Sequence, residues 1–127
     1  MNLVKIFEEK YGRKPLLARA PGRINIIGEH TDYNDGFVLP AAIDKYAHFA
    51  IQKNQTLDCN VTALDLNENT SFSLTSTLKR TTNGWLNIVL GVVDGFVKEG
   101  ATISGFDLMF TSDVPVGSGM SSSAAIE

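Results

Sequence analysis

The chain has 127 residues, 43% of them hydrophobic and 20% charged, which is typical of one globular domain and excludes a disordered chain. Eleven Lys and Arg residues against 14 Asp and Glu give a formal net charge of −3, which argues against binding to nucleic acid or to an anionic membrane surface. The single cysteine, Cys59, excludes an internal disulfide and favours a reducing compartment.

A helix is predicted at the N-terminus. Asn2 is a suitable N-cap and Gly12 a suitable stop. The apolar residues between them share one helical face, namely Leu3, Ile6, Phe7 and Tyr11. The same segment carries charged side chains in place of the apolar region of a secretory signal peptide. We therefore expect no signal peptide here.

Short extended segments are predicted next. Two apolar runs, 16–20 and 24–28, are separated by Pro21 and Gly22. Strands are predicted at 46–52, 57–66 and 71–75, with a turn at 67–69 and a polar loop at 75–84. His48 falls inside the first of these strands, where we interpret it as a packed or surface histidine.

Residues 85–99 give the strongest helix prediction, and Gly100 follows as a C-terminal cap. The predicted apolar stripe consists of Trp85, Ile88, Val89, Val92, Val93, Phe96 and Val97. Polar residues and glycines interrupt this stretch, so it falls short of the roughly 18–20 apolar residues of a membrane span. We expect a soluble, cytoplasmic protein.

The remaining residues predict a strand, a loop and a short helix. Residues 103–111 alternate with period two. The alternation places Phe106, Leu108 and Phe110 on one face and Asp107 and Met109 on the other. Residues 121–127 then begin a helix that has no capping signal and is too short to be stable alone. We therefore expect the chain to be the N-terminal portion of a longer protein.

A glycine-serine loop, residues 115–123 (PVGSGMSSS), connects this strand to the last helix. Glycines let backbone N–H groups approach a phosphate, and a helix start adds unsatisfied donors. The hydroxyls of Ser121, Ser122 and Ser123 can bond phosphate oxygens or a phosphate-bound Mg²⁺. The loop lacks the lysine of a Walker A loop and the third glycine of the dinucleotide fingerprint.

Two other interpretations of this loop are open. It can be a plain strand-to-helix turn in which serines cap the helix. A nucleophilic serine assisted by His30 and Asp32 is disfavoured, because the sequence has no G-x-S-x-G elbow around these serines.

A second concentration of polar chemistry lies at residues 20–33 (APGRINIIGEHTDY). Glu29, His30 and Asp32 offer acceptors and donors to several hydroxyls at once, which is what a polyol requires. The Arg23 guanidinium can stabilise negative charge on a transferring phosphoryl group. The alternatives are a solvated loop with a local ion pair, or a His-x-Asp metal fragment for which the sequence offers no further ligand set.

Residues 22–33 resemble the galactokinase signature, and residues 115–125 resemble the ATP-phosphate loop of the GHMP small-molecule kinases. The resemblance covers essentially the whole chain, including residues 36–44 (GFVLPAAID). It implies an α+β fold: residues 1–127 as the N-terminal domain of the GHMP kinases, a mixed β-sheet backed by helices and incomplete at its C-terminus. It also implies that the catalytic aspartate and an acidic Mg²⁺ ligand lie beyond Glu127, so that this portion is inactive alone.

The resemblance implies phosphorylation of the anomeric hydroxyl of galactose, with ATP and Mg²⁺ as cofactors. Glu29, His30 and Asp32 would hold the sugar hydroxyls, and Arg23 would stabilise the transition state. The triphosphate would be wrapped by Gly117, Ser118, Gly119, Met120, Ser121, Ser122 and Ser123, with Ser123 also a Mg²⁺ ligand. Met120 stands where the family usually has leucine, an apolar exchange of similar volume.

Two other functions are compatible with the resemblance. A sensor that binds galactose and ATP without turnover is disfavoured, because residues 121–125 carry no insertion. A kinase for a related sugar, such as arabinose or N-acetylgalactosamine, remains open. The expected partners are galactose and ATP, with no nucleic acid and no membrane, and the full-length protein is expected to be a monomer.

Overall fold

The computed structural model describes residues 1–28, 32–117 and 119–127. In these residues, five strands form one mixed sheet in the order β1-β2-β5-β3-β4. The strands are β1 (Leu16–Ile27), β2 (Leu39–Lys53), β3 (Asp58–Ala63), β4 (Glu68–Ser73) and β5 (Phe106–Ser112). Neighbouring strands are antiparallel, except that β3 and β5 are parallel. The predicted fold class, α+β with a mixed sheet, is confirmed.

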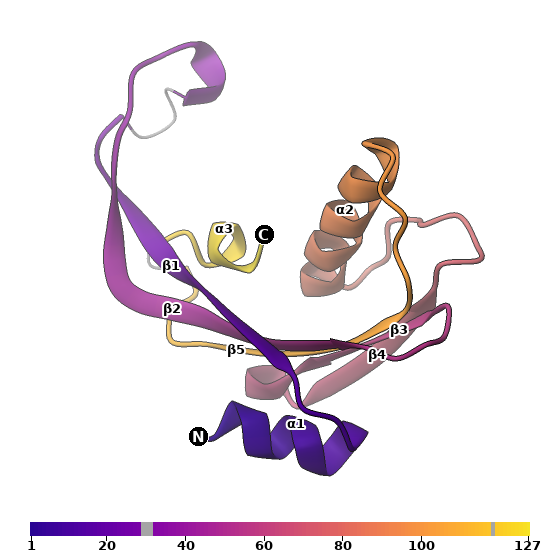
Figure 1. Cartoon of the computed structure of the whole chain (residues 1–127). Helices are drawn as coiled ribbons and strands as arrows, with labels where there is room; N and C mark the ends of the chain where they lie inside the picture. The colour runs from indigo at the N-terminus through magenta and orange to yellow at the C-terminus, as the bar shows by residue number, and fades with distance from the viewer. Residues whose placement is uncertain (29–31, 118) are drawn as a thin grey trace.

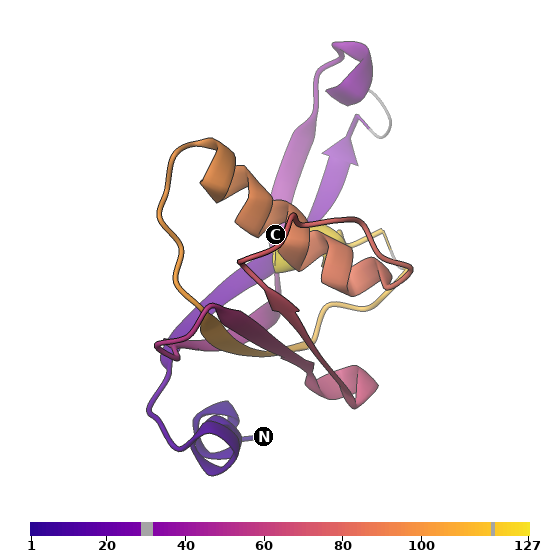
Figure 2. The same cartoon turned by 90° about the vertical axis from the view of Figure 1, so that its right-hand side faces the viewer.

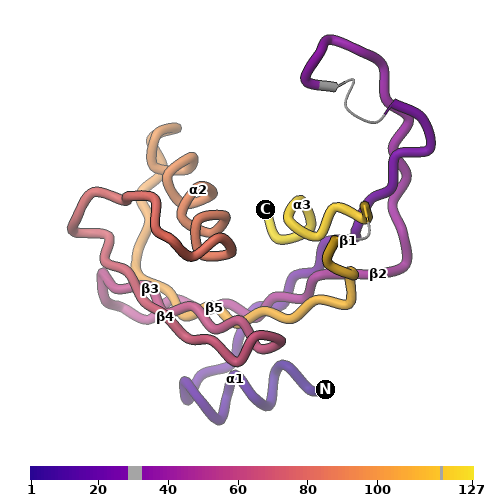
Figure 3. Tube along the Cα trace, turned by 180° about the vertical axis from the view of Figure 1, so that it is seen from behind, coloured from indigo at the N-terminus to yellow at the C-terminus, as the bar shows by residue number. Residues whose placement is uncertain are grey.

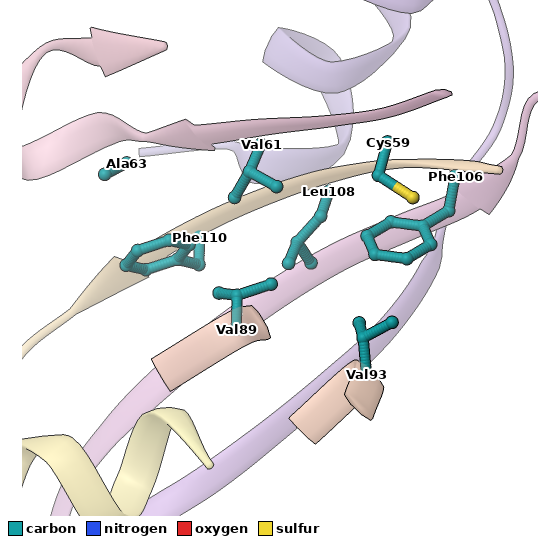
Figure 4. Packing of buried hydrophobic residues seen from close by; sticks show 8 residues of the cluster. All are labelled: Cys59, Val61, Ala63, Val89, Val93, Phe106, Leu108 and Phe110. Atoms are coloured by element: carbon teal, nitrogen blue, oxygen red, sulfur yellow. The ribbon is translucent and has the colours of Figure 1, made fainter. Parts of the chain in front are cut away.

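Helices cover both faces of the sheet (Figure 1). α1 (Leu3–Tyr11) lies on one face, whereas α2 (Gly84–Lys98) and α3 (Ser122–Ile126) lie on the other. The alternation of β5 explains this arrangement. Phe106, Leu108 and Phe110 pack against α2 in the main core, and Met109 packs on the opposite face against Phe7 of α1. The predicted assignment of β5 side chains to two faces is thus confirmed, and Figure 4 shows the cluster beneath α2.

The ends of the two longer helices follow the predicted caps. Asn2 Oδ1 accepts a hydrogen bond from the Lys5 amide at 3.1 Å, and Gly12 ends α1 with a φ of +69°. α2 begins at Gly84, one residue earlier than predicted, because Asn83 Oδ1 caps the Leu86 amide at 3.2 Å. Gly100 follows α2 with a φ of +87°, a conformation that glycine adopts without strain.

The predicted apolar stripe of α2 is partly wrong. Val89 and Val93 are buried as expected, but Leu86 and Leu90, which the stripe omitted, are buried with them. Phe96 and Val97 are 59% and 48% exposed. The reason is tertiary: the C-terminal end of α2 rises away from the sheet (Figure 2), so its last turn has no strand to pack against.

β1 and β2 are longer than predicted. The two apolar runs at 16–20 and 24–28 form one strand, with a register shift between Pro21 and Arg23. Pro21 is tolerated because β1 lies at the edge of the sheet, where a missing N–H donor breaks no ladder. β2 begins at Leu39, well before the predicted start at Tyr46, because its first half pairs with the second half of β1. This pairing builds an arm, residues 23–42, that projects beyond the rest of the sheet (Figure 1).

β3 and β4 are shorter than or shifted from their predicted ranges. β3 ends at Ala63, and Leu64–Leu66 form a 3-10 turn instead of continuing the strand. Asn67 adopts a φ of +52°, and β4 starts directly afterwards at Glu68, inside the predicted turn. Residues 75–83 form a loop, as predicted, but Gly84, the last residue of the predicted loop, begins α2.

Candidate functional site

The motif at residues 20–33 meets the glycine-serine loop at Arg23. Arg23 lies on β1, and the glycine-serine loop connects β5 to α3, which packs on β1 and β2. The Arg23 amide donates to the Met120 carbonyl at 2.9 Å. The Arg23 guanidinium donates to Ser121 Oγ at 3.0 Å, across 98 residues of sequence. Figure 3 shows β1 and the C-terminal segment together from behind.

The described part of the loop has an unusual backbone. Gly117 and Gly119 have φ values of +73° and +75°, which glycine adopts readily and other residues rarely. Ser121 has a φ of +57° although it is not glycine. Such local strain persists only where neighbouring groups hold it, and the contacts with Arg23 lie at this residue. Ser118 lies outside the described residues.

The serine-capping alternative is wrong for Ser121. This residue stands at the N-cap position of α3, but its side chain makes no cap hydrogen bond. Its hydroxyl accepts from Arg23 instead. Ser122 is half-buried and Ser123 is exposed, so the Ser123 hydroxyl faces solvent and can reach a ligand.

A small apolar cluster fixes the base of the loop. Val114, at the start of the loop, is 3% exposed and packs with Ala47 of β2 and Ala125 of α3. Just before it, the Asp113 amide donates to the Tyr46 carbonyl at 2.9 Å. The two alanines leave little side-chain bulk between α3 and the sheet, so the helix lies close to β1 and β2.

The structure describes only part of the predicted sugar-binding set. Glu29 and His30 lie outside the described residues. Asp32 begins a short 3-10 helix, Asp32–Asn34, and only its backbone is described. The structure therefore does not test how these three side chains are arranged. The roles predicted for them, for Arg23 and for residues 117–123 stay predictions.

Two residues outside these motifs have defined roles in the fold. His48 lies on β2, is 38% exposed, and contacts Asp113 Oδ2 at 3.3 Å, which agrees with a surface histidine. Cys59 is fully buried beneath α2, and this burial raises the pKa of its thiol. A buried thiol with a raised pKa is a poor nucleophile.

Two cavities of the described structure lie away from the residues of both motifs. One cavity, of about 940 Å³, lies on the α1 face between α1 and the sheet and includes Arg19, His48 and Asp113. Another, of about 720 Å³, lies beside α2 and is lined by Ile88, Val92 and Glu127 among others. Neither is lined by a residue of 20–33 or 115–123.

The described residues contain neither a metal-binding cluster nor a membrane-spanning helix. Outside 29–31 and 118, no cluster of three or more His, Cys, Asp or Glu side chains is suited to a metal ion. The helices in the same part of the chain are all too short or too polar to cross a membrane.

Sequence reasoning missed the way in which Arg23 joins the two motifs. It assigned the guanidinium to a phosphoryl group but did not anticipate the bonds to Met120 and Ser121. A contact across 98 residues leaves no periodic or compositional signal in one sequence.

Family models match both motifs. The galactokinase galactose-binding signature matches residues 5–53, and the N-terminal domain of the GHMP kinases matches residues 87–127. The galactokinase of Chloroflexus aurantiacus is 42% identical over 127 residues, and that of a Roseiflexus species is 46% identical over 122 residues. These alignments cover 99% and 95% of this chain but 33% and 31% of the relatives. The chain thus spans about a third of the length of the curated relatives it matches.

Solved structures agree with the family models. The galactokinase of Lactococcus lactis, solved in complex with galactose, is similar with a TM-score of 0.87 and 33% identity, over 98% of this chain and 34% of that one. The mevalonate kinase of Methanococcus jannaschii has a TM-score of 0.75 at 20% identity, over 89% of this chain and 37% of that one. This second likeness shows a shared fold.

Proposed function

We propose that this chain is part of a GHMP kinase that transfers the γ-phosphoryl group of ATP to the anomeric hydroxyl of galactose, because the galactokinase galactose-binding signature and the GHMP kinase N-terminal domain both match it. The anomeric oxygen forms a new bond to the γ-phosphorus, the bond from that phosphorus to the β–γ bridging oxygen breaks, and ADP leaves. The proton of the hydroxyl is released to a base, and we assign no base within this chain.

One observation carries the proposal: Arg23 belongs to the sugar motif, yet its guanidinium lies 3.0 Å from a hydroxyl of the phosphate loop. Phosphoryl transfer takes place where the sugar and the phosphate chain meet, and Arg23 lies where the two motifs meet. Arginine is charged at all physiological pH values and presents several donors in a plane, which suits a phosphoryl group as its charge develops.

The remaining roles follow from the chemistry of each segment. Glu29, His30 and Asp32 hold the hydroxyls of galactose. Residues 117–123 hold the ATP phosphates through the positive-φ backbone at Gly117 and Gly119 and through serine hydroxyls. The loop is the only part of ATP recognition that we assign to this chain.

We propose that the protein uses Mg²⁺-bound ATP, and the hydroxyl oxygens of the glycine-serine loop fit that ion. The ion is a hard cation that prefers oxygen, and Ser123 offers an exposed hydroxyl beside the loop. Together with phosphate oxygens, Ser123 would hold Mg²⁺, which supplies positive charge to the phosphates when bound.

A chimera tests the proposal. This chain would replace the matched third of the Lactococcus lactis galactokinase, and product formation would be measured with ATP and a panel of sugars. We expect galactose 1-phosphate with galactose, and much less product with arabinose or N-acetylgalactosamine. The matched third of the Chloroflexus aurantiacus galactokinase, spliced at the same position, is the control for the junction.

The outcomes separate the candidate functions. An active control with an inactive test chimera that still binds galactose and ATP would indicate a sensor. A preference for another sugar would replace galactose as the substrate. An active control with no binding of either ligand by the test chimera would reject the proposal altogether.

A further inference from the structure

β1 and the glycine-serine loop approach each other most closely at Gly22. A Cβ atom built on Gly22 would lie 2.9 Å from the Met120 carbonyl oxygen. It would also lie 3.0 Å from Ile43 Cδ1 and 3.0 Å from Val114 Cγ1. Real Cβ atoms essentially never have contacts shorter than 3.0 Å, so the neighbouring atoms, the Met120 carbonyl above all, would have to move.

Glycine is required at position 22 because a larger side chain would not fit there, and not because of its backbone conformation. Gly22 is not among the glycines with positive φ, so its backbone conformation is open to any residue. Ile43 Cδ1 is the end of a longer side chain, which can shift at small cost, whereas Val114 is held in a packed cluster. The third is a backbone carbonyl, and moving it moves the loop.

The carbonyl concerned is the one that Arg23 holds. The Arg23 amide donates to Met120 O at 2.9 Å, and the next residue, Ser121, accepts from the Arg23 guanidinium. Beneath the loop, Val114, Ala47 and Ala125 are packed with almost no exposure. Because the base is packed, a displaced Met120 would have to move away from β1, which lengthens and weakens its hydrogen bond from the Arg23 amide.

We propose that Gly22 is a positioning residue for phosphoryl transfer. Its missing side chain lets Met120 and the serines lie against β1, which keeps the phosphate loop beside the sugar motif. The inference rests on the proposed function for its kinetic consequence, while its structural consequence can be measured separately.

Gly22→Ala in the chimera described above tests the kinetic consequence. We expect the KM for ATP to rise at least tenfold and kcat to fall, while the KM for galactose changes less than threefold. Gly105→Ala is the matched control. A Cβ at Gly105 would lie 2.5 Å from the Thr56 carbonyl, which is tighter than at Gly22, but Gly105 precedes β5 and the loop follows it. Gly105→Ala should lower the Tm and leave the KM for ATP unchanged.

A combined variant separates positioning from folding. Ile43→Val removes Ile43 Cδ1, one of the side-chain atoms that Gly22→Ala would meet, and leaves the packed Val114 and the Met120 carbonyl in place. Added to Gly22→Ala, this change should restore part of the lost Tm without restoring the KM for ATP. If the KM for ATP returns to its original value, the carbonyl contact does not position the loop and the inference is overturned.

Amide hydrogen exchange on the 127-residue chain gives a readout that needs no activity. Gly22→Ala should accelerate exchange of the Arg23 amide at least tenfold, because its acceptor moves away, whereas Gly105→Ala should not change it beyond its effect on global unfolding. Unchanged exchange would overturn the inference even if the chimera is active. Accelerated exchange would support it even if the wild-type chimera is inactive and the proposed function fails.

Discussion

Arg23 is the residue on which both motifs converge. Its backbone amide and its side chain contact neighbouring residues of the same loop. The amide contact has a structural role, and we propose a chemical role for the guanidinium. The backbone contact survives any substitution other than proline. Substitution of the side chain therefore isolates the chemical part, which makes Arg23 a suitable first target.

Arg23→Ala should lower kcat in the active chimera by roughly 10²–10⁴, because charge stabilisation acts mainly in the transition state. The KM for galactose should change far less. Arg23→Lys keeps the charge but loses the planar set of donors, so it should recover only part of the rate. Steady-state kinetics with both substrates would check this, and a raised KM with an unchanged kcat would contradict the assignment.

Ser123 is the residue that we assign to Mg²⁺. Its hydroxyl is exposed, whereas the Ser121 hydroxyl is already bonded to Arg23. Ser123→Ala should raise the Mg²⁺ concentration needed for half-maximal rate, because one oxygen ligand is lost. Ser76→Ala, in the exposed loop after β4, is the control and should leave the Mg²⁺ titration unchanged. A Ser123→Ala titration that overlays the wild type would place the ligand elsewhere.

At the scale of elements, one buried carboxylate holds the lower part of the sheet together. Asp107 of β5 is 2% exposed and forms an ion pair with Arg13, which follows α1. Its other oxygen accepts from Asn60 of β3 at 2.7 Å and from Asn54, which follows β2, at 3.2 Å. The carboxylate thus joins segments that are distant in sequence.

Asp107→Ala should lower the free energy of unfolding by about 1–3 kcal/mol, because the partly exposed Arg13 guanidinium and two asparagine amides each lose one hydrogen-bond acceptor. Asp94→Ala is the matched control. It removes the exposed ion pair of Asp94 with Lys98 and should change stability by about 0–1 kcal/mol. Urea denaturation of the 127-residue chain would measure both, and equal losses would refute the role given to Asp107.

The elements also indicate which patterns one sequence can define. α1 follows its predicted caps because capping is local: Asn2 and Gly12 act on residues within one helical turn. The start of β2 at Leu39 was missed because that segment is extended only through its pairing with β1. Phe96 and Val97 of α2 fit the apolar stripe, and only the path of the helix above the sheet leaves them exposed.

At the scale of the whole molecule, the arm exposes apolar side chains. Ile26, Ile27, Phe37 and Leu39 are between 52% and 97% exposed. Contiguous apolar surface of this kind is uncommon on soluble monomers and promotes association. The edge strand β1 also presents unpaired backbone groups, which adds to the tendency.

The 127-residue chain by itself should show no detectable formation of galactose 1-phosphate. Phosphoryl transfer requires both substrates in position, a metal clamp and a base, and we assign only part of these to this chain. A coupled assay of the purified chain checks this, with the active chimera as control. Turnover within tenfold of that chimera would show that residues 1–127 suffice.

Because of the exposed apolar side chains of the arm, sedimentation analysis of the 127-residue chain should also show self-association that increases with protein concentration.

The sequence by itself determined which chemistry can be predicted for this protein. The motifs at 20–33 and 115–125 contain their residue types in consecutive positions, so the glycines and serines proposed to bind phosphate and the polar set proposed to bind sugar are visible without a fold. The two faces of β5 were also predicted, because periodicity is a local property, whereas the α+β class followed from the family resemblance of the two motifs.

Only the tertiary structure decided how these chemistries meet. The contact of Arg23 with Ser121, the close approach of Gly22 to Met120 and the ion pair of Arg13 with Asp107 all join residues about 94–98 apart. Each depends on the sheet order, which places β2 between β1 and β5 and lets α3 cross back over β1. Because such contacts arise from chain topology and packing, the local pattern of the sequence does not contain them.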